Sequence, residues 1–220
     1  MIYIVHHNPY QYMDGPLPDG YEPLGVGSQW IEQEDGINHL NPVINELTAV
    51  YDVWKNTDDD IVGFSHYHRF FQYIEDGEQK FLTFDKAKEF LEAADIILTY
   101  PVDYKDISLE QQLAIDFRED LPTYFKLMNR LYQTEGLRQY FDGTKFHPRN
   151  MFVCRRELLE SYCEWLFPVL IPIAEDFLRE DYPKYHHYYN RMIGFIAERL
   201  LSFWVNKEQL SVLTLPIKET

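Results

Sequence analysis

Short apolar runs alternate along this chain with segments whose apolar residues recur at helical spacing. The apolar runs are typical of buried strands. We predict strands at residues 2–5, 61–65, 95–99 and 151–154, with an edge strand at 212–215. The helical pattern predicts helices at residues 43–54, 84–94, 108–116, 120–134, 156–167 and about 189–206. This alternation predicts an α/β fold with a mostly parallel central sheet flanked by helices.

The longest segment without a clear period covers residues 8–42 and is rich in proline and glycine. We predict a long loop there, and long loops in compact domains tend to carry function. The next helix should begin at Asn41 and Pro42, because asparagine is a good N-cap and proline suits the first helical position. Glu46 then falls at the edge of an apolar helix face.

Polar side chains gather where three predicted strands end. In parallel α/β sheets, ligands bind outside the carboxyl ends of the strands. The segments that fall there are His6-His7-Asn8, His66 to Arg69, and the residues after Leu98. We therefore expect the functional site at this edge of the sheet.

The composition suits one globular domain over residues 1–220, with 45% apolar residues and 16% aromatic residues. The chain carries 36 acidic and 20 basic side chains, a net charge of −16. Nucleic acid is disfavoured as a partner, because so acidic a body repels phosphate backbones. The acidity is concentrated in residues 1–110, which hold 21 acidic and 6 basic side chains and a single arginine, Arg69.

The two cysteines, Cys154 and Cys163, are too few for a disulfide framework and suit a reducing compartment. No apolar run approaches the ~18 residues of a membrane span. The first residues lack the basic and apolar regions of a signal peptide. We therefore expect a cytoplasmic protein without a transmembrane segment, and peripheral association with the inner face of the membrane stays open.

The densest polar cluster is His66-Tyr67-His68-Arg69. Arginine donates paired hydrogen bonds that suit phosphate or carboxylate. The His-x-His spacing places both imidazoles on one side of an extended segment, where they could serve as metal ligands or acid–base groups. A purely structural role, in which these side chains bond the acidic residues 58–60, is weighed equally.

Further candidates precede or follow other apolar segments. Arg149 and Asn150 stand just before a predicted strand, and asparagine can bind a sugar hydroxyl. Glu198 and Arg199 lie inside an apolar helix, where a structural ion pair and a functional role are equally open. The run 58–60 precedes its strand and is interpreted as a solvated turn. The chain lacks the P-loop, the dinucleotide-binding glycine motif, the serine-hydrolase elbow and the zinc-protease motif.

The order of several motifs resembles the DUF4422 family. The motifs that carry the resemblance are Asn41-Pro42, Glu46-Leu47-Thr48-Ala49, Trp54-Lys55-Asn56, Gly63 to Phe71, Asp95 to Leu98, Asn150 to Val153, and Gly194 to Leu201. Members are bacterial proteins of capsule and exopolysaccharide synthesis that are regarded as glycosyltransferases. The resemblance implies a GT-A-like fold in a single domain. It also implies a nucleotide-sugar donor and a saccharide or lipid-linked saccharide acceptor.

The resemblance implies a donor site as well. Enzymes of this fold hold a metal against the diphosphate with an Asp-x-Asp, and this chain has His66 to Arg69 there instead. Either His66 and His68 hold Mn²⁺ or Mg²⁺, or Arg69 neutralises the diphosphate directly, which is the simpler alternative. The expected donor-binding residues are His7, His66, Tyr67, Arg69, Arg149, Asn150 and Arg199.

Glu46, Asp95, Asp103 and Glu198 are possible bases for an acceptor hydroxyl. Glu46 and Glu198 are the expected catalytic carboxylates, because a carboxylate beside an apolar helix face needs a reason to be there. His68, Asn8 and Asp116 differ from residues that are common in the family at these positions. Two alternatives to a glycosyltransferase are a non-catalytic carbohydrate- or nucleotide-sugar-binding module and a metal-dependent hydrolase. The module could stack sugars on Tyr10, Tyr12 and Trp30. The hydrolase would use His66, His68 and a carboxylate.

Overall fold

A central sheet with helices on both faces organises the chain, as seen in a computed structural model that describes residues 1–7, 17–29, 36–184 and 187–219. Within these residues nine strands form one sheet. Its main path runs in the order β10-β6-β9-β3-β1-β2. These strands are β1 (Ile2–His6), β2 (Tyr21–Gly25), β3 (Ile61–His66), β6 (Ile96–Thr99), β9 (Phe152–Arg155) and β10 (Val212–Leu215).

The sheet is mostly parallel, which confirms the predicted fold class. β1 pairs in parallel with β2 and with β3, and β10 pairs in parallel with β6. The exception is β9, which lies antiparallel between β3 and β6. The beginning of β9 therefore lies at the same edge of the sheet as the ends of β1 and β3.

The predicted loop 8–42 is wrong in one part, because it contains β2 with its sequence Tyr-Glu-Pro-Leu-Gly. Proline and glycine argue against a central strand. Among the strands of the described residues, however, β2 stands at the edge of the sheet and pairs only with β1. An edge strand tolerates a proline, because one side of its backbone needs no partner.

Three antiparallel strands extend the sheet and were not predicted: β4 (Arg69–Glu75), β5 (Glu78–Phe81) and β11 (Ile217–Glu219). β4 pairs with β3, β5 and β11. The turn between β4 and β5 is Asp76-Gly77, and both residues have positive φ. Asp-Gly is a common two-residue hairpin turn, so this hairpin had a signal in the sequence. A separate small ribbon joins β7 (Val102–Asp103) to β8 (Lys145–Phe146).

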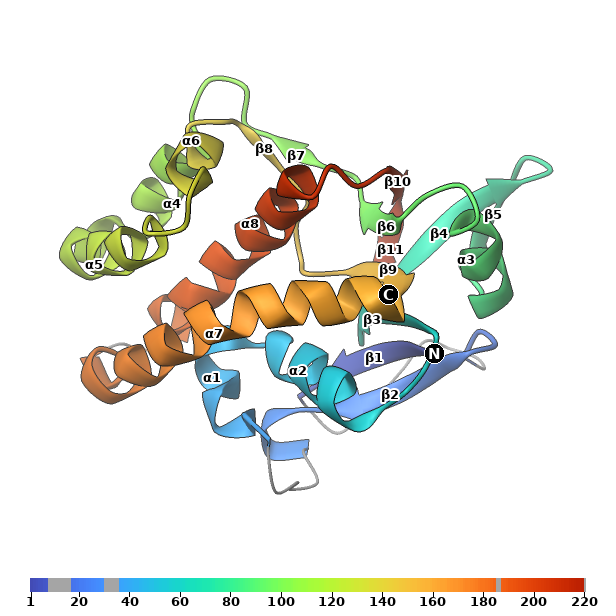
Figure 1. Cartoon of the computed structure of the whole chain (residues 1–220), viewed down its shortest axis with the longest axis horizontal. Helices are drawn as coiled ribbons and strands as arrows, with labels where there is room; N and C mark the ends of the chain where they lie inside the picture. The colour runs from blue at the N-terminus through green and yellow to red at the C-terminus, as the bar shows by residue number, and fades with distance from the viewer. Residues whose placement is uncertain (8–16, 30–35, 185–186, 220) are drawn as a thin grey trace.

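Most helices lie on one side of the sheet (Figure 1). They are α1 (Asn41–Ile44), α2 (Leu47–Asn56), α4 (Leu109–Asp116), α5 (Leu121–Leu131), α6 (Leu137–Phe141), α7 (Arg156–Glu180) and α8 (Met192–Lys207). Only α3 (Phe84–Phe90) lies on the other side, beside β4 and β5, among the helices of the described residues (Figure 1). α7 continues well beyond the predicted end at 167, with Pro168 and Pro172 inside the helix.

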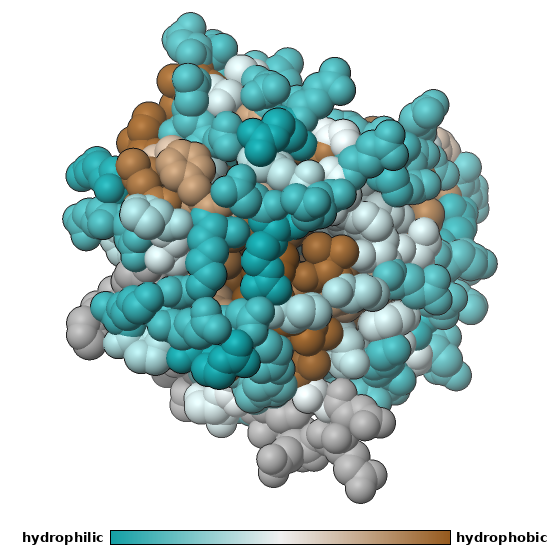
Figure 2. All heavy atoms as spheres, turned by 60° about the vertical axis from the view of Figure 1, so that its left-hand side comes forward, coloured by the Kyte–Doolittle hydropathy of each residue, from teal (hydrophilic) through white to brown (hydrophobic). Residues whose placement is uncertain are grey.

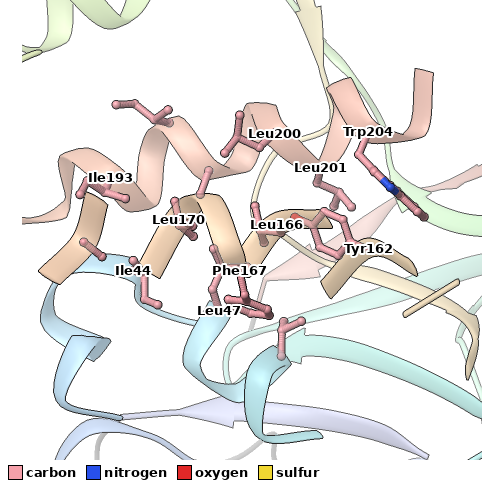
Figure 3. Packing of buried hydrophobic residues seen from close by; sticks show 14 of the residues in the cluster. Ile44, Leu47, Tyr162, Leu166, Phe167, Leu170, Ile193, Leu200, Leu201 and Trp204 are labelled. Atoms are coloured by element: carbon pink, nitrogen blue, oxygen red, sulfur yellow. The ribbon is translucent and has the colours of Figure 1, made fainter. Parts of the chain in front are cut away.

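Side chains alternate along the strands between two hydrophobic clusters. On β1, Tyr3 and Val5 join the larger cluster, whereas Ile2 and Ile4 join the smaller one over α3. In the larger cluster, α7 packs between α2 and α8 (Figure 3). This alternation fixes the register of the strands, since a slip by one residue would turn every side chain to the wrong face.

No helix in the described part of the chain is both long and apolar enough to cross a membrane.

Candidate functional site

A cavity of about 730 Å³ opens at the edge of the sheet where β1 and β3 end and β9 begins. The sequence-predicted residues that line it are His7, Glu46, His66, Tyr67, His68, Arg69, Arg149 and Glu198. Figure 2 shows the side of the molecule on which α1, α5 and the start of α8 lie. That side is mainly hydrophilic, with a hollow near the middle where hydrophobic residues are visible. The structure thus brings together residues from five segments that are separated in the sequence.

His66 ends β3 and is hydrogen-bonded at both ring nitrogens. Its Nε2 lies 2.8 Å from the carbonyl oxygen of Arg149, and its Nδ1 lies 3.2 Å from Nη1 of Arg69. An arginine can only donate, so Nδ1 accepts and Nε2 carries the proton. Burial, and then the charge of Arg69, lower the pKa of His66 to about 3. The imidazole is therefore neutral and holds Arg69 in place.

The residues at this edge do not fit the metal pair expected from His66 and His68. A metal ligand needs a free ring nitrogen, and both nitrogens of His66 are already in use. No group of three or more His, Cys, Asp or Glu side chains within the described residues is arranged to hold a metal ion. His68 lines the cavity with a buried Nδ1 that has no hydrogen-bond partner in the described part of the chain.

Arg69 and Arg149 lie on the same side of the cavity, although they come from the two halves of the sequence. Nε of Arg69 donates to Oε1 of Glu219 at 2.9 Å. Nη2 of Arg149 lies 3.7 Å from the same oxygen. Two guanidinium groups that converge on one oxygen form a place where an anion is stabilised. The positive pocket lies in an otherwise acidic protein.

Glu46 reaches the cavity because the predicted helix 43–54 is interrupted. α1 ends at Ile44, Asn45 has φ 52° and ψ −125°, and α2 starts at Leu47. The carbonyl of Asn45 accepts hydrogen bonds from Nδ2 of Asn41 at 2.9 Å and from Oγ1 of Thr48 at 2.8 Å. The motif residues Asn41 and Thr48 therefore hold a kink that a regular helix would lack.

Gly194 gives this kink the space that it needs against α8. A Cβ at Gly194 would lie 2.0 Å from Nδ2 of Asn45, which is far inside van der Waals contact. The Oδ1 of Asn45 accepts from Nε of Arg191 at 3.1 Å, just before α8 begins. Close approach of two backbones is a common use of glycine. The Gly194 motif and the Glu46 motif thus build one structural unit.

Glu46 and Glu198 bring two carboxyl groups to one cavity. Burial raises the pKa of Glu46, although a hydrogen bond from Asn150 and the charges of Arg191 and Arg69 oppose the rise. Burial also raises the pKa of Glu198, and the negative charge of Glu46 raises it further. The guanidinium of Arg199, 3.8 Å from a carboxyl oxygen of Glu198, opposes the rise in the pKa of Glu198.

Asn150 links Glu46 to the beginning of β9. Its Nδ2 donates to Oε1 of Glu46 at 2.9 Å, while its own Oδ1 is buried without a partner in the described residues. Arg149 and Asn150 both have positive φ, of 79° and 49°. Non-glycine residues in this region store strain, which is concentrated at functional sites. Together with Asn45, they place strained backbone on both sides of the Glu46 hydrogen bond.

Arg199 is the expected donor-binding residue that the structure places elsewhere. Its guanidinium donates to the carbonyl of Phe195 and to Oε1 of Gln112, each at 2.7 Å, and stacks on Phe146. Gln112 also donates a hydrogen bond to Asp116, so Asp116 belongs to the hydrogen-bond network of Arg199. Arg199 is almost fully buried, and its contacts are those of a structural cation.

Other candidates also have structural positions or cannot be described. Asp59 accepts a hydrogen bond of 2.6 Å from the hydroxyl of Tyr3, so the acidic run 58–60 does not pair with the His66 cluster. Tyr10, Tyr12 and Trp30 lie outside the described residues, as does Asn8.

Several cavity residues were missed by the sequence interpretation: Asn45, Tyr182, Asn190, Arg191 and Phe195. Phe195 stands one turn before Glu198 on α8, so the helical period placed it on the same face. Arg191 had no comparable signal, because its role depends on contact with Asn45, 146 residues away in the sequence.

The fold is similar to that of a solved structure described as the WbbM bifunctional glycosyltransferase in its apo state. The TM-score is 0.71 at 23% sequence identity, with 100% of this chain and 45% of that chain covered. The chain thus spans less than half of the structure that it matches, and no curated protein matches it. The sequence model of the family "Domain of unknown function (DUF4422)" matches residues 1–209. With nearly its whole length matched, the chain belongs to the DUF4422 family.

Proposed function

We propose that this protein transfers a glycosyl group from a nucleotide-diphosphate sugar to a saccharide acceptor. The observation that carries the proposal is the arrangement of the cavity, where Arg69 and Arg149 converge beside the carboxyl groups of Glu46 and Glu198. Glycosyl transfer needs both kinds of group, because a diphosphate leaves as an anion while an acceptor hydroxyl loses a proton. The fold shared with a glycosyltransferase supports the same reaction class.

In this proposal the two arginines bind the diphosphate of the donor. Their guanidinium groups stabilise the negative charge that develops on the leaving diphosphate. His66 fixes Arg69 through its Nδ1 and remains neutral, so it adds no competing charge. His7 and Tyr67, whose rings meet edge-on at 5.6 Å, form a wall for the nucleotide. Asn150 orients Glu46 from beside the cavity.

Glu46 is the proposed base that takes the proton of the acceptor hydroxyl. It is the carboxyl group that Asn150, Arg191 and Arg69 favour in the ionised form. Its pKa is nevertheless raised by burial, which makes it a stronger base than an exposed glutamate. Glu198 lines the cavity beside it and can form a hydrogen bond with the sugar.

The acceptor is proposed to be a saccharide or a lipid-linked saccharide of bacterial capsule, exopolysaccharide or lipopolysaccharide synthesis. We place the reaction in the cytoplasm, at or near the inner face of the membrane. The support for this setting is the family to which the chain belongs. No step of the proposal passes through an ion at His66 and His68; whether Mn²⁺ or Mg²⁺ assists the donor is left to experiment.

A thermal-shift screen against nucleotide sugars, with and without Mn²⁺, identifies the donor. A ligand at about 100 times its dissociation constant stabilises the folded protein by about 2.7 kcal/mol, which is measurable. The selected donor is then used to compare turnover by the wild type and by Arg69→Ala. We expect Arg69→Ala to lose turnover while its unfolding curve stays close to that of the wild type.

The matched control is Arg138→Ala, because Arg138 of α6 stacks on Tyr132 at the end of α5 and does not line the cavity. Its turnover should be that of the wild type. Unchanged turnover in Arg69→Ala would overturn the assignment of the diphosphate site. Donor binding without transfer or hydrolysis over a broad acceptor panel would instead identify a binding module on the same fold.

A further inference from the structure

Glu219 brings a carboxylate of the chain itself into the arginine pair. It lies in β11, directly opposite Arg69 in the antiparallel register with β4. One oxygen, Oε1, lies 2.9 Å from Nε of Arg69 and 3.7 Å from Nη2 of Arg149. The carboxylate thus lies between the two cationic groups that the proposed function assigns to a diphosphate.

Glu219 differs in its exposure to solvent from the two glutamates that line the cavity. The side chain of Glu198 is 18% exposed, whereas that of Glu219 is 59% exposed. β11 has three residues and, within the described residues, pairs with β4. Ile217 packs on the smaller cluster and Lys218 lies over the ring of Phe81, so the strand stays in place when the exposed ion pair of Glu219 opens. An exposed ion pair of this kind is weak and can be replaced by a stronger anion.

We propose that Glu219 is a placeholder anion, which occupies the Arg69–Arg149 site until the diphosphate of a ligand displaces it. The inference rests on the proposed function for the identity of the ligand. It adds that a residue beyond the matched family segment, which ends at 209, sets the affinity of the site. The chemical class of the displacing group is a diphosphate, whether free or attached to a nucleoside.

Displacement follows from charge. A diphosphate carries more negative charge than one carboxylate and offers oxygens to both guanidinium groups at once. Glu219 keeps Arg69 oriented before the ligand arrives, which lowers the ordering cost of binding. Glu219 also competes with the ligand for the two arginines. The apparent affinity for the ligand is therefore the intrinsic affinity multiplied by the fraction of molecules in which the site is free. For an exposed pair that reduction is about two- to sixfold.

The test is a calorimetric titration of wild type and Glu219→Gln with inorganic pyrophosphate, UDP and uridine at constant ionic strength. The glutamine keeps the shape of the side chain and removes its charge. We expect pyrophosphate and UDP to bind about two- to sixfold more tightly to the variant. Uridine, which has no diphosphate, should bind both proteins equally.

Glu89→Gln is the matched control for the change in total charge. Glu89 is 61% exposed and pairs with Lys86 at 2.9 Å in α3, on the other side of the sheet. This control should bind pyrophosphate like the wild type. In the background Arg69→Ala, the change Glu219→Gln should give a smaller gain, because one of the two groups that hold the carboxylate is gone.

Equal or weaker binding of pyrophosphate by Glu219→Gln overturns the placeholder role, and so does an absence of pyrophosphate binding in both proteins. The outcome for the proposed function is separate. Tighter diphosphate binding without any glycosyl transfer supports the placeholder and removes the transferase. Transfer by the wild type with unchanged affinity in Glu219→Gln leaves the transferase and removes the placeholder.

Discussion

The two edges of the central sheet contain similar residue types, but they use them in different ways. At the edge opposite the cavity, polar groups are paired: Tyr3 bonds Asp59 at 2.6 Å, and Arg156 donates to the carbonyls of Val53 and Trp54. At the cavity edge, buried polar atoms of His68 and Asn190 have no partner within the described residues. Unpaired buried polar atoms are rare, so they indicate places where a ligand completes the bonding.

Backbone strain separates the two edges in the same way. Around the cavity, Asn45, Arg149 and Asn150 hold positive φ next to the Glu46 hydrogen bond. Elsewhere, the positive φ values of Asp76, Lys105 and Gln209 occur in a hairpin turn, in the turn that follows β7 and just after α8, where such conformations are usual. The comparison teaches that charged residues alone do not mark the site. Around the cavity, strained backbone and unsatisfied groups accompany the charged residues, whereas single unsatisfied atoms occur elsewhere, as at Tyr162 and Arg199.

Glu46→Gln tests the cavity edge with the largest expected effect. Loss of a general base lowers turnover by about 10²- to 10⁴-fold. Since burial raises the pKa of Glu46, wild-type activity should fall with acidification at a higher pH than for an ordinary glutamate. The folded state favours the neutral form of Glu46. The stability that this neutral form contributes is present at acidic pH and is lost as pH rises through the pKa of Glu46 in the folded protein.

The free energy of unfolding of Glu46→Gln, relative to that of the wild type, should therefore increase from acidic pH to pH 8. Urea unfolding at several pH values measures this change. The matched control is Glu160→Gln at the opposite edge, where Glu160 pairs with Arg156 at 3.1 Å. It should keep full turnover. Turnover of Glu46→Gln within a factor of two of the wild type would move the base to another residue.

Gly194→Ala tests whether the kink before Glu46 depends on close packing. The added methyl group would meet the amide of Asn45, so we expect a loss of about 1–3 kcal/mol in the free energy of unfolding. Asn45→Gly in the same background should restore stability, because it removes the clashing side chain and suits φ 52°. Urea unfolding measures both. Equal stability of Gly194→Ala and the wild type would show that the contact yields without cost.

Arg156→Ala tests the opposite edge and has the smallest expected effect. Its guanidinium donates to two carbonyls at the end of α2, at 3.1 and 2.6 Å. Its removal should cost about 1–2 kcal/mol of stability, because hydrogen bonds from a charged donor are lost. Pyrophosphate binding, measured by calorimetry, should not change. A marked loss of binding would mean that the two edges are not functionally distinct.

Much of the cavity was predictable from position along the strands. His66 and Arg69 follow a buried apolar run, and the carboxyl end of such a run is where α/β proteins bind ligands. Glu46 and Glu198 were found as carboxylates beside apolar helix faces. The prediction for Arg199 used the same pattern as that for Glu198. It led to the wrong side of the helix, because neighbouring positions on a helix point about 100° apart.

The sequence by itself determined most of the helices and the strands β1, β3, β6, β9 and β10, since the period of apolar residues depends only on near neighbours. It also determined the motifs that place the family and most of its cavity residues. Tertiary structure alone decided the antiparallel direction of β9, the kink at Asn45 and the meeting of Glu219 with two arginines. These features depend on contacts between residues up to 150 positions apart, which no local pattern encodes.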